Sequence, residues 1–224
     1  MVARAGSTDQ DQASAALAWL VERYWDPLRR LARRWLRNDA AADDALQDFF
    51  CRLVERRTDL AILESGRGPF RSWILTVYRN FLFDRIAHDQ TAKRGGGRLI
   101  QGIDSIEPPG CSGPDLEYER DWAETVLGRS IDRLAAEQVS DEERRRFATL
   151  RVFLVANGSS EAYIAAGTTL GLSEGAVKVA VHRLRQSLRD MARLEIIDTL
   201  DEPSQSEVDQ ELETLAQALM SRSR

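Results

Sequence analysis

The sequence has little of what disulfide-rich, metal-binding and membrane proteins need. It contains two cysteines, Cys51 and Cys111, which are too few for a disulfide framework or a cysteine zinc cluster. It contains only two histidines, His88 and His182. No apolar run approaches the roughly 20 residues that span a bilayer, and the first residues lack the apolar stretch of a secretory signal. We therefore expect a cytoplasmic protein with no membrane insertion.

Signatures of catalysis are missing as well. No glycine-rich phosphate loop is followed by Lys-Ser or Lys-Thr, and no spacing suggests metal ligands. The three glycines at 95–97 match no dinucleotide-binding pattern. A hydrolase that used Cys51 with His88 or His182 would ignore the helical periodicity around these residues. We expect no catalytic residue, no cofactor and no metal, so that the activity consists of binding.

The charge is unevenly distributed along the chain. Between Glu22 and Arg37, six arginines face two acids, and between Ser173 and Leu194, five cations face two acids. From Glu195 onward, eight acids face two arginines. The formal net charge of −5 is therefore an average over two basic segments and an acidic tail. This average does not exclude a nucleic-acid partner.

Apolar residues recur at three- and four-residue intervals almost everywhere, which predicts an all-α protein. The main interruption is rich in glycine and proline, which neither helix nor sheet tolerates well. The chain divides into a disordered N-terminus at 1–14, a helical unit at 15–92, a flexible linker at 93–114, a second helical unit at 115–194 and an acidic C-terminal extension at 195–224. One side of the extension's predicted helix carries Val208, Leu212, Leu215 and Leu219.

The stretch from Glu161 to Leu188 has the pattern of a helix-turn-helix. Gly171 can adopt the left-handed conformation that ends the first helix, and Ser173 suits the N-cap of the second. Gly167 is small at the point where the two helices must cross closely. Ordinary helical hairpins share this spacing, so the motif favours DNA binding without establishing it.

The second helix of this motif has one apolar sector, at about 100° per residue. That sector must face the core and holds Val177, Val181, Leu184 and Leu188. The outer side suits the major groove, where Lys178 would reach guanine and Val179 a thymine methyl. Arg183 and Arg185 suit phosphates, whereas His182 is as easily an exposed histidine without a role. The candidate DNA-binding residues are Ser173, Glu174, Lys178, Val179, His182, Arg183 and Arg185.

The segment SEGAVKVAVHRLRQSLRD, at 173–190, resembles the recognition helix of extracytoplasmic-function sigma factors. In that family the helix belongs to the second conserved domain, region 4, which reads the −35 promoter element. The preceding residues, roughly 115–154, are similar to the first half of the same domain. The resemblance implies a region 4-like helix-turn-helix domain at 115–194.

The segment AADDALQDFFCRLVER, at 41–56, resembles the polymerase-binding helix of the first sigma domain, region 2. Its expected buried stripe contains Leu46, Phe49, Phe50 and Leu53. A polar outer face needs no partner by itself, so the interface follows only from the resemblance. The implied polymerase-binding residues are Asp44, Gln47, Asp48 and Arg52.

The segment at 68–94 is similar to the part of region 2 that recognises and helps to open the −10 element. Its expected core stripe contains Phe70, Ile74, Val77 and Phe81. Trp73 lies off that stripe and Phe83 opposite it, so each either packs against a neighbouring helix or stacks on an unpaired base. The candidate residues for the melted strand are Arg71, Trp73, Arg79, Asn80, Phe83, Arg85, Lys93 and Arg94. The family's base-capturing loop would be 64–69.

The resemblance implies a sigma factor that directs core RNA polymerase to promoter DNA. The alternative is a stand-alone helix-turn-helix regulator, which would have no reason for an aromatic, basic strand-melting helix. Family members are often restrained by a partner such as an anti-sigma factor. The tail also resembles that of a subgroup met in planctomycetes, and its acidity suggests the hypothesis that it folds back on basic faces.

Overall fold

The computed structural model describes residues 10–55, 70–93, 116–200 and 203–220, and the regular elements in these ranges are helices. The predicted all-α class is therefore confirmed. Three helices precede the predicted linker: α2 (Gln10–Leu36), α3 (Asp39–Glu55) and α5 (Phe70–Lys93). After it come α6 (Leu116–Ala136), α7 (Asp141–Leu150), the 3-10 helix η2 (Arg151–Phe153), α8 (Ser160–Leu170), α9 (Glu174–Thr199) and α10 (Gln205–Met220).

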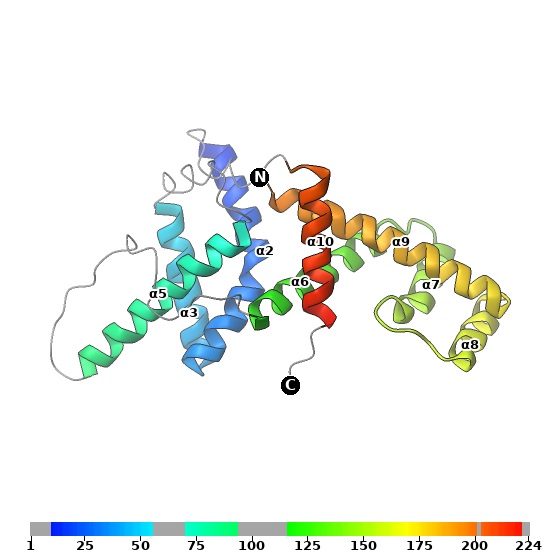
Figure 1. Ribbon diagram of the computed structural model, residues 1–224, viewed down its shortest axis with the longest axis horizontal. Helices are drawn as coiled ribbons and strands as arrows, with labels where there is room; N and C mark the ends of the chain where they lie inside the picture. The colour runs from blue at the N-terminus through cyan, green and yellow to red at the C-terminus, as the bar shows by residue number, and fades with distance from the viewer. Residues whose placement is uncertain (1–9, 56–69, 94–115, 201–202, 221–224) are drawn as a thin grey trace.

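The helices are arranged along one long axis (Figure 1). The α2, α3 and α5 helices lie at one end, and α7, α8 and the start of α9 lie at the other. Between them, α6 packs against α2, α9 and α10. Within the described ranges, no helix combines the length and apolarity needed to cross a membrane.

Local capping explains where several helices begin and end. Arg37 has a positive φ of 52°, which turns the chain after α2. The side chain of Asn38 then accepts a hydrogen bond of 3.0 Å from the backbone N–H of Ala41 and caps α3. Ser140 and Glu143 form a reciprocal capping box at the start of α7.

The main core joins the first three helices to α6. The ring of Tyr24 on α2 is fully buried and stacks on Trp122 of α6, with ring centroids 4.8 Å apart. Phe70 of α5 packs edge-on against the same Tyr24 ring, with ring centroids 5.2 Å apart. The second half of α6 enters a different cluster, where Leu134 packs with residues of α7 and α9. One helix thus contributes to the cores on both sides of the predicted linker.

The predicted buried stripes fit most of the structure. The four stripe residues of α3 are at most 7% exposed, and Leu188, Val177 and Val181 of α9 are buried as expected. Val77 of α5 and Leu184 of α9 are exceptions, because both are only partly buried. The buried face of α5 is turned toward Tyr78 and Leu82, both 0% exposed, because α5 packs against α2 and α3 together.

The C-terminal part of the chain continues further than the motif alone indicates. The α9 helix extends past Leu194 to Thr199, and Ile196 in this extension is fully buried. The α10 helix buries Val208 and Leu215, while Leu212 is partly buried and Leu219 is 36% exposed. The expected apolar side of α10 is therefore confirmed for Val208, Leu212 and Leu215 but not for Leu219, and it packs against α6 and α9.

Candidate nucleic-acid interface

The turn between α8 and α9 has the geometry of a helix-turn-helix. Gly171 ends α8 with a φ of 66°, in the left-handed region predicted for it. A Cβ on Gly167 would lie 2.5 Å from the carbonyl oxygen of Leu172, so the close crossing requires glycine. The Ser173 hydroxyl accepts a 3.3 Å hydrogen bond from the N–H of Ala176 and caps α9. The local predictions for this turn are confirmed.

The start of α9 presents an exposed mixed surface. Val179 is 53% exposed, and Lys178, His182 and Arg183 are also exposed. A salt bridge of 2.7 Å joins the Lys178 amine to Glu174. This hydrogen bond raises the pKa of Lys178 and lowers that of Glu174. Hydrogen-bond donors and an apolar side chain therefore face outward from one helix, as major-groove readout requires.

The guanidinium of Arg185 is used inside the protein. It donates hydrogen bonds to the carbonyl of Phe153 at 2.6 and 3.0 Å. It also donates to the carbonyl of Ala156 at 3.0 Å and to the Asn157 side chain at 2.9 Å. This ties α9 to the chain after η2, which differs from the phosphate contact expected for Arg185. Its role in DNA binding stays a prediction.

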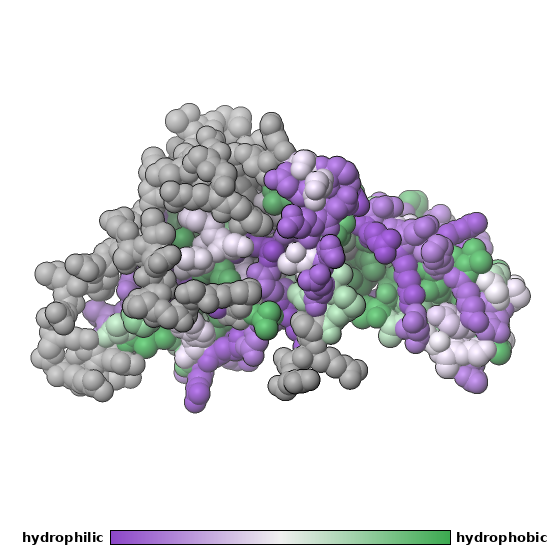
Figure 2. Space-filling view, in the orientation of Figure 1, coloured by the Kyte–Doolittle hydropathy of each residue, from purple (hydrophilic) through white to green (hydrophobic). Residues whose placement is uncertain are grey.

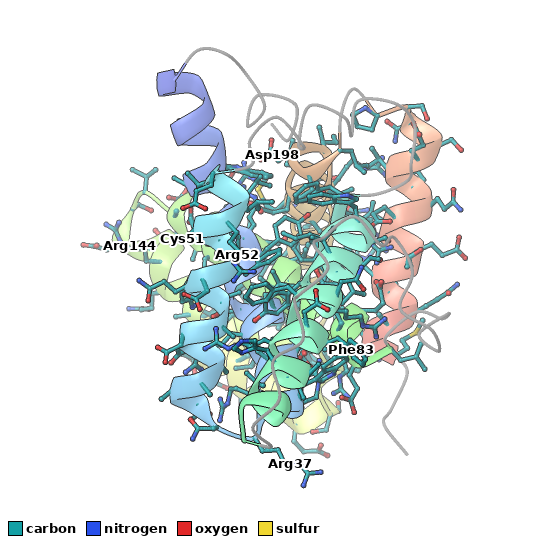
Figure 3. The ribbon with its side chains drawn as sticks, turned by 90° about the vertical axis from the view of Figure 1, so that its left-hand side faces the viewer. Arg37, Cys51, Arg52, Phe83, Arg144 and Asp198 are labelled. Atoms are coloured by element: carbon teal, nitrogen blue, oxygen red, sulfur yellow. The ribbon has the colours of Figure 1, made fainter. Side chains whose placement is uncertain are left out.

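The second candidate surface lies on α3 and α5. Figure 3 shows Arg52 on α3 and Phe83 on α5, with these two helices side by side. The four residues predicted to bind polymerase are all exposed along α3 and are Asp44, Gln47, Asp48 and Arg52. Asp48 accepts a 2.5 Å hydrogen bond from Arg85 of α5, and the Arg52 guanidinium lies 5.0 Å from the centre of the Phe81 ring. The predicted polymerase face and strand-binding face are therefore adjacent.

The two aromatic residues of α5 that the sequence left open, Trp73 and Phe83, differ in exposure. Phe83 is 56% exposed and is available as a stacking surface. Trp73 is partly buried, and its ring centroid lies 5.3 Å from that of Phe70. This supports packing for Trp73. Arg79 and Asn80 are partly buried and make contacts within the protein.

Arg71 is buried between helices, a placement that the sequence did not predict. It is 7% exposed and pairs with Glu119 of α6 and Glu211 of α10. This placement differs from the open strand-binding position expected for it. Lys93 ends α5 and nothing is described of its side chain, while Arg94 and the loop 64–69 lie outside the described residues.

The basic segment of α2 is largely neutralised by acids of other helices. Arg30 and Arg34 both pair with Asp121 of α6, at 3.2 and 2.5 Å. Arg29 pairs with Asp43, Arg33 with Asp39, and Arg23 with Glu195. The arginine-rich face of α2 is therefore engaged in ion pairs within the protein. The sequence does not reveal these pairs because some partners are very distant along the chain, such as Glu195, 172 positions after Arg23.

Comparisons with known proteins agree with this geometry. Residues 20–91 match the family model for sigma-70 region 2. The chain is 29% identical over 185 residues to the ECF RNA polymerase sigma factor SigE of Mycolicibacterium smegmatis, covering 80% of this chain and 63% of that protein. It is also 29% identical over 181 residues to the ECF RNA polymerase sigma factor SigL of Mycobacterium tuberculosis, covering 79% of this chain and 91% of that one.

The alignments take in most of the chain, although it covers less than two thirds of the length of the M. smegmatis protein. No solved structure matches the chain. The region 2 match covers nearly all of the helices that carry the α3 and α5 surface, and both relatives are ECF RNA polymerase sigma factors. The chain is therefore similar to sigma-70 region 2 over residues 20–91 and, over about four fifths of its length, to ECF RNA polymerase sigma factors.

Proposed function

We propose that this protein is a sigma factor that directs core RNA polymerase to specific promoters and initiates DNA-templated transcription. It acts as a binding and specificity subunit in the cytoplasm, without chemistry of its own. The observation that carries the proposal is the pairing of two parts in one chain. A segment similar to sigma-70 region 2 is joined to a capped helix-turn-helix with an exposed recognition face.

The α3 face is the proposed polymerase contact. Its polar side chains stay exposed along the helix while the opposite side is buried in the main core. Such a charged helix surface suits a partner of complementary charge, because opposite charges steer association and fix the orientation of the complex. Asp48 lies at its centre and is held by Arg85.

The two DNA elements would be read by different parts of the chain. The exposed start of α9 would enter the major groove at −35, with Lys178 and Val179 toward the bases. Phe83 on α5 would stack on an unpaired base of the −10 strand. Domain boundaries and these residue roles remain proposals, as does a restraining partner such as an anti-sigma factor.

A charge reversal on α3 tests the proposed polymerase contact. We expect Asp48→Arg to weaken binding to purified bacterial core RNA polymerase by about tenfold or more, because the reversal removes an anion from the centre of the interface. Binding is measured by fluorescence anisotropy of the labelled protein and by co-elution in gel filtration.

Two variants control this experiment. Asp132→Arg makes the same charge change at an exposed position of α6, away from the proposed contact, and should bind like the wild type. Arg85→Ala breaks the pair with Asp48 without reversing its charge, which separates loss of the pair from loss of the interface. If the wild-type chain binds promoter duplex tightly but does not bind core polymerase at any salt concentration, it is instead a stand-alone regulator.

A further inference from the structure

A buried cluster of charges joins α5, α6 and α10. The Arg71 guanidinium donates to both carboxylate oxygens of Glu211, through Nε and through Nη2, and the Nη2 distance is 3.1 Å. Its third nitrogen, Nη1, donates to Glu119. The side chains of Arg71, Glu211 and Glu119 are 8, 10 and 13% exposed. Arg71 is thus held by two acids in a site closed to solvent.

The contact with Glu211 has the geometry of phosphate recognition. Arginine binds carboxylate and phosphate groups through the same paired N–H donors. Glu211 therefore occupies the donors that Arg71 would offer to a phosphate of a DNA strand. The opposite, solvent-facing side of α10 is hydrophilic, as Figure 2 shows, so α10 is an amphipathic cover over this part of the molecule.

The remaining contacts of α10 are made with α6 and α9. Val208 and Leu215 are its buried apolar side chains, and Arg193 of α9 pairs with Asp209 at 2.6 Å on the surface. Exposed pairs of this kind contribute little to stability. A buried pair also contributes less than its geometry suggests, because both groups lost their hydration. Displacing α10 exposes Val208 and Leu215 of the main core, so a competing polyanion must offset the loss of these two apolar contacts as well as the ion pairs.

We propose that α10 is an autoinhibitory clasp, in which Glu211 competes with nucleic-acid phosphate for Arg71. The inference rests on the proposed function, because it assigns Arg71 to the single strand that α5 would contact. In the closed form Arg71 is sequestered. When α10 leaves, Nε and Nη2 of Arg71 lose their carboxylate partner, while Nη1 still donates to Glu119 of α6.

The test measures single-strand binding with and without the clasp. The probe is a fluorescein-labelled oligothymidylate of about 16 nucleotides, and anisotropy is recorded over a range of KCl concentrations. Deleting residues 203–224 should tighten binding about fivefold or more and steepen the slope of log K against log salt by about 0.7, as one added phosphate contact requires. In an Arg71→Ala background, the same deletion should increase the affinity for the oligonucleotide much less and leave the salt slope unchanged.

Point variants cover the case in which the deletion fails to fold. Glu211→Gln removes the charge that holds Arg71, and Glu213→Gln makes the same change at an exposed position of the same helix. We expect tighter binding and a steeper slope for Glu211→Gln alone, and loss of both in the Arg71→Ala/Glu211→Gln double variant. Circular dichroism confirms that each variant is folded.

The outcomes separate the two proposals. Three results would overturn the clasp. The first is equal oligonucleotide binding by Glu211→Gln and Glu213→Gln, and the second is additive effects of Arg71→Ala and Glu211→Gln on that binding. The third is undetectable binding of the oligonucleotide by Glu211→Gln at low salt. If the clasp variants behave as expected but the chain never binds core polymerase, the proposed function fails and the clasp on Arg71 stands.

Discussion

Glu195 is a buried carboxylate at the place where α2, α6 and α9 meet. It is 3% exposed and pairs with Arg23 at 3.3 Å, Arg129 at 3.2 Å and Arg133 at 2.7 Å. Burial lowers the pKa of Arg23, while the charge of Glu195 opposes that shift. The carboxylate therefore stabilises a guanidinium that would otherwise be buried without enough compensating charge.

Replacing Glu195 should destabilise the protein strongly. We expect Glu195→Ala to lower the free energy of unfolding by about 3–5 kcal/mol, because it leaves Arg23 as a buried charge with a weaker partner. Urea unfolding followed by circular dichroism measures this. Asp198→Ala is the matched control, since Asp198 contacts Arg23 and Arg133 at longer distances and its side chain is 43% exposed. Similar losses for both variants would contradict the argument.

At the scale of the elements, the α8–α9 crossing depends on the absence of one side chain. Gly167 lies so close to the Leu172 carbonyl that a methyl group there must push the backbone apart. Gly128 in α6 offers the opposite case, because a Cβ built on it meets nothing within 4 Å. The same substitution should therefore have opposite effects in the two helices.

The glycine pair gives a signed prediction. Gly167→Ala should cost about 1–3 kcal/mol of stability through overpacking, whereas Gly128→Ala should raise stability by about 0.5–1 kcal/mol by reducing the entropy of the unfolded chain. Thermal and urea unfolding give both values. The prediction for the crossing is wrong if Gly167→Ala is neutral or stabilising.

At the scale of the whole molecule, α6 packs into the hydrophobic clusters at both ends of the helical array. Its first half supplies Trp122 to the main core, stacked on Tyr24, and its second half supplies Leu134 to a cluster with α7 and α9. Arg30 and Arg34 of α2 add ion pairs to Asp121 of α6. The two predicted units therefore share a helix and much of their stability.

This arrangement predicts one cooperative unfolding transition. Trp122→Ala, in the main core, and Val177→Ala, in the helix-turn-helix core, should shift the same transition, with the larger loss of about 3–5 kcal/mol for Trp122→Ala. Far-ultraviolet circular dichroism and tryptophan fluorescence should report coincident midpoints for Val177→Ala. Two separate midpoints, only one of which moves in each variant, would show that the ends unfold independently.

The sequence alone determined those features that depend on neighbours along the chain. The period of apolar residues predicted the helices and most of the buried stripes, and the turn chemistry of Gly171 and Ser173 predicted the helix-turn-helix. These signals act within a few residues, so they can be read without knowing the fold. The motif at 41–56 also carried a resemblance to sigma-70 region 2, and it lies within the residues that match that family model.

The tertiary structure decided what the charges do. Arg71 and Arg23 are ordinary members of basic segments in the sequence, yet their partners are 140 and 172 positions away, at Glu211 and Glu195. Ion pairing between distant helices depends on how those helices pack, and a helical wheel contains no such information. The same holds for Val77, whose partial burial follows from α5 packing against two helices at once.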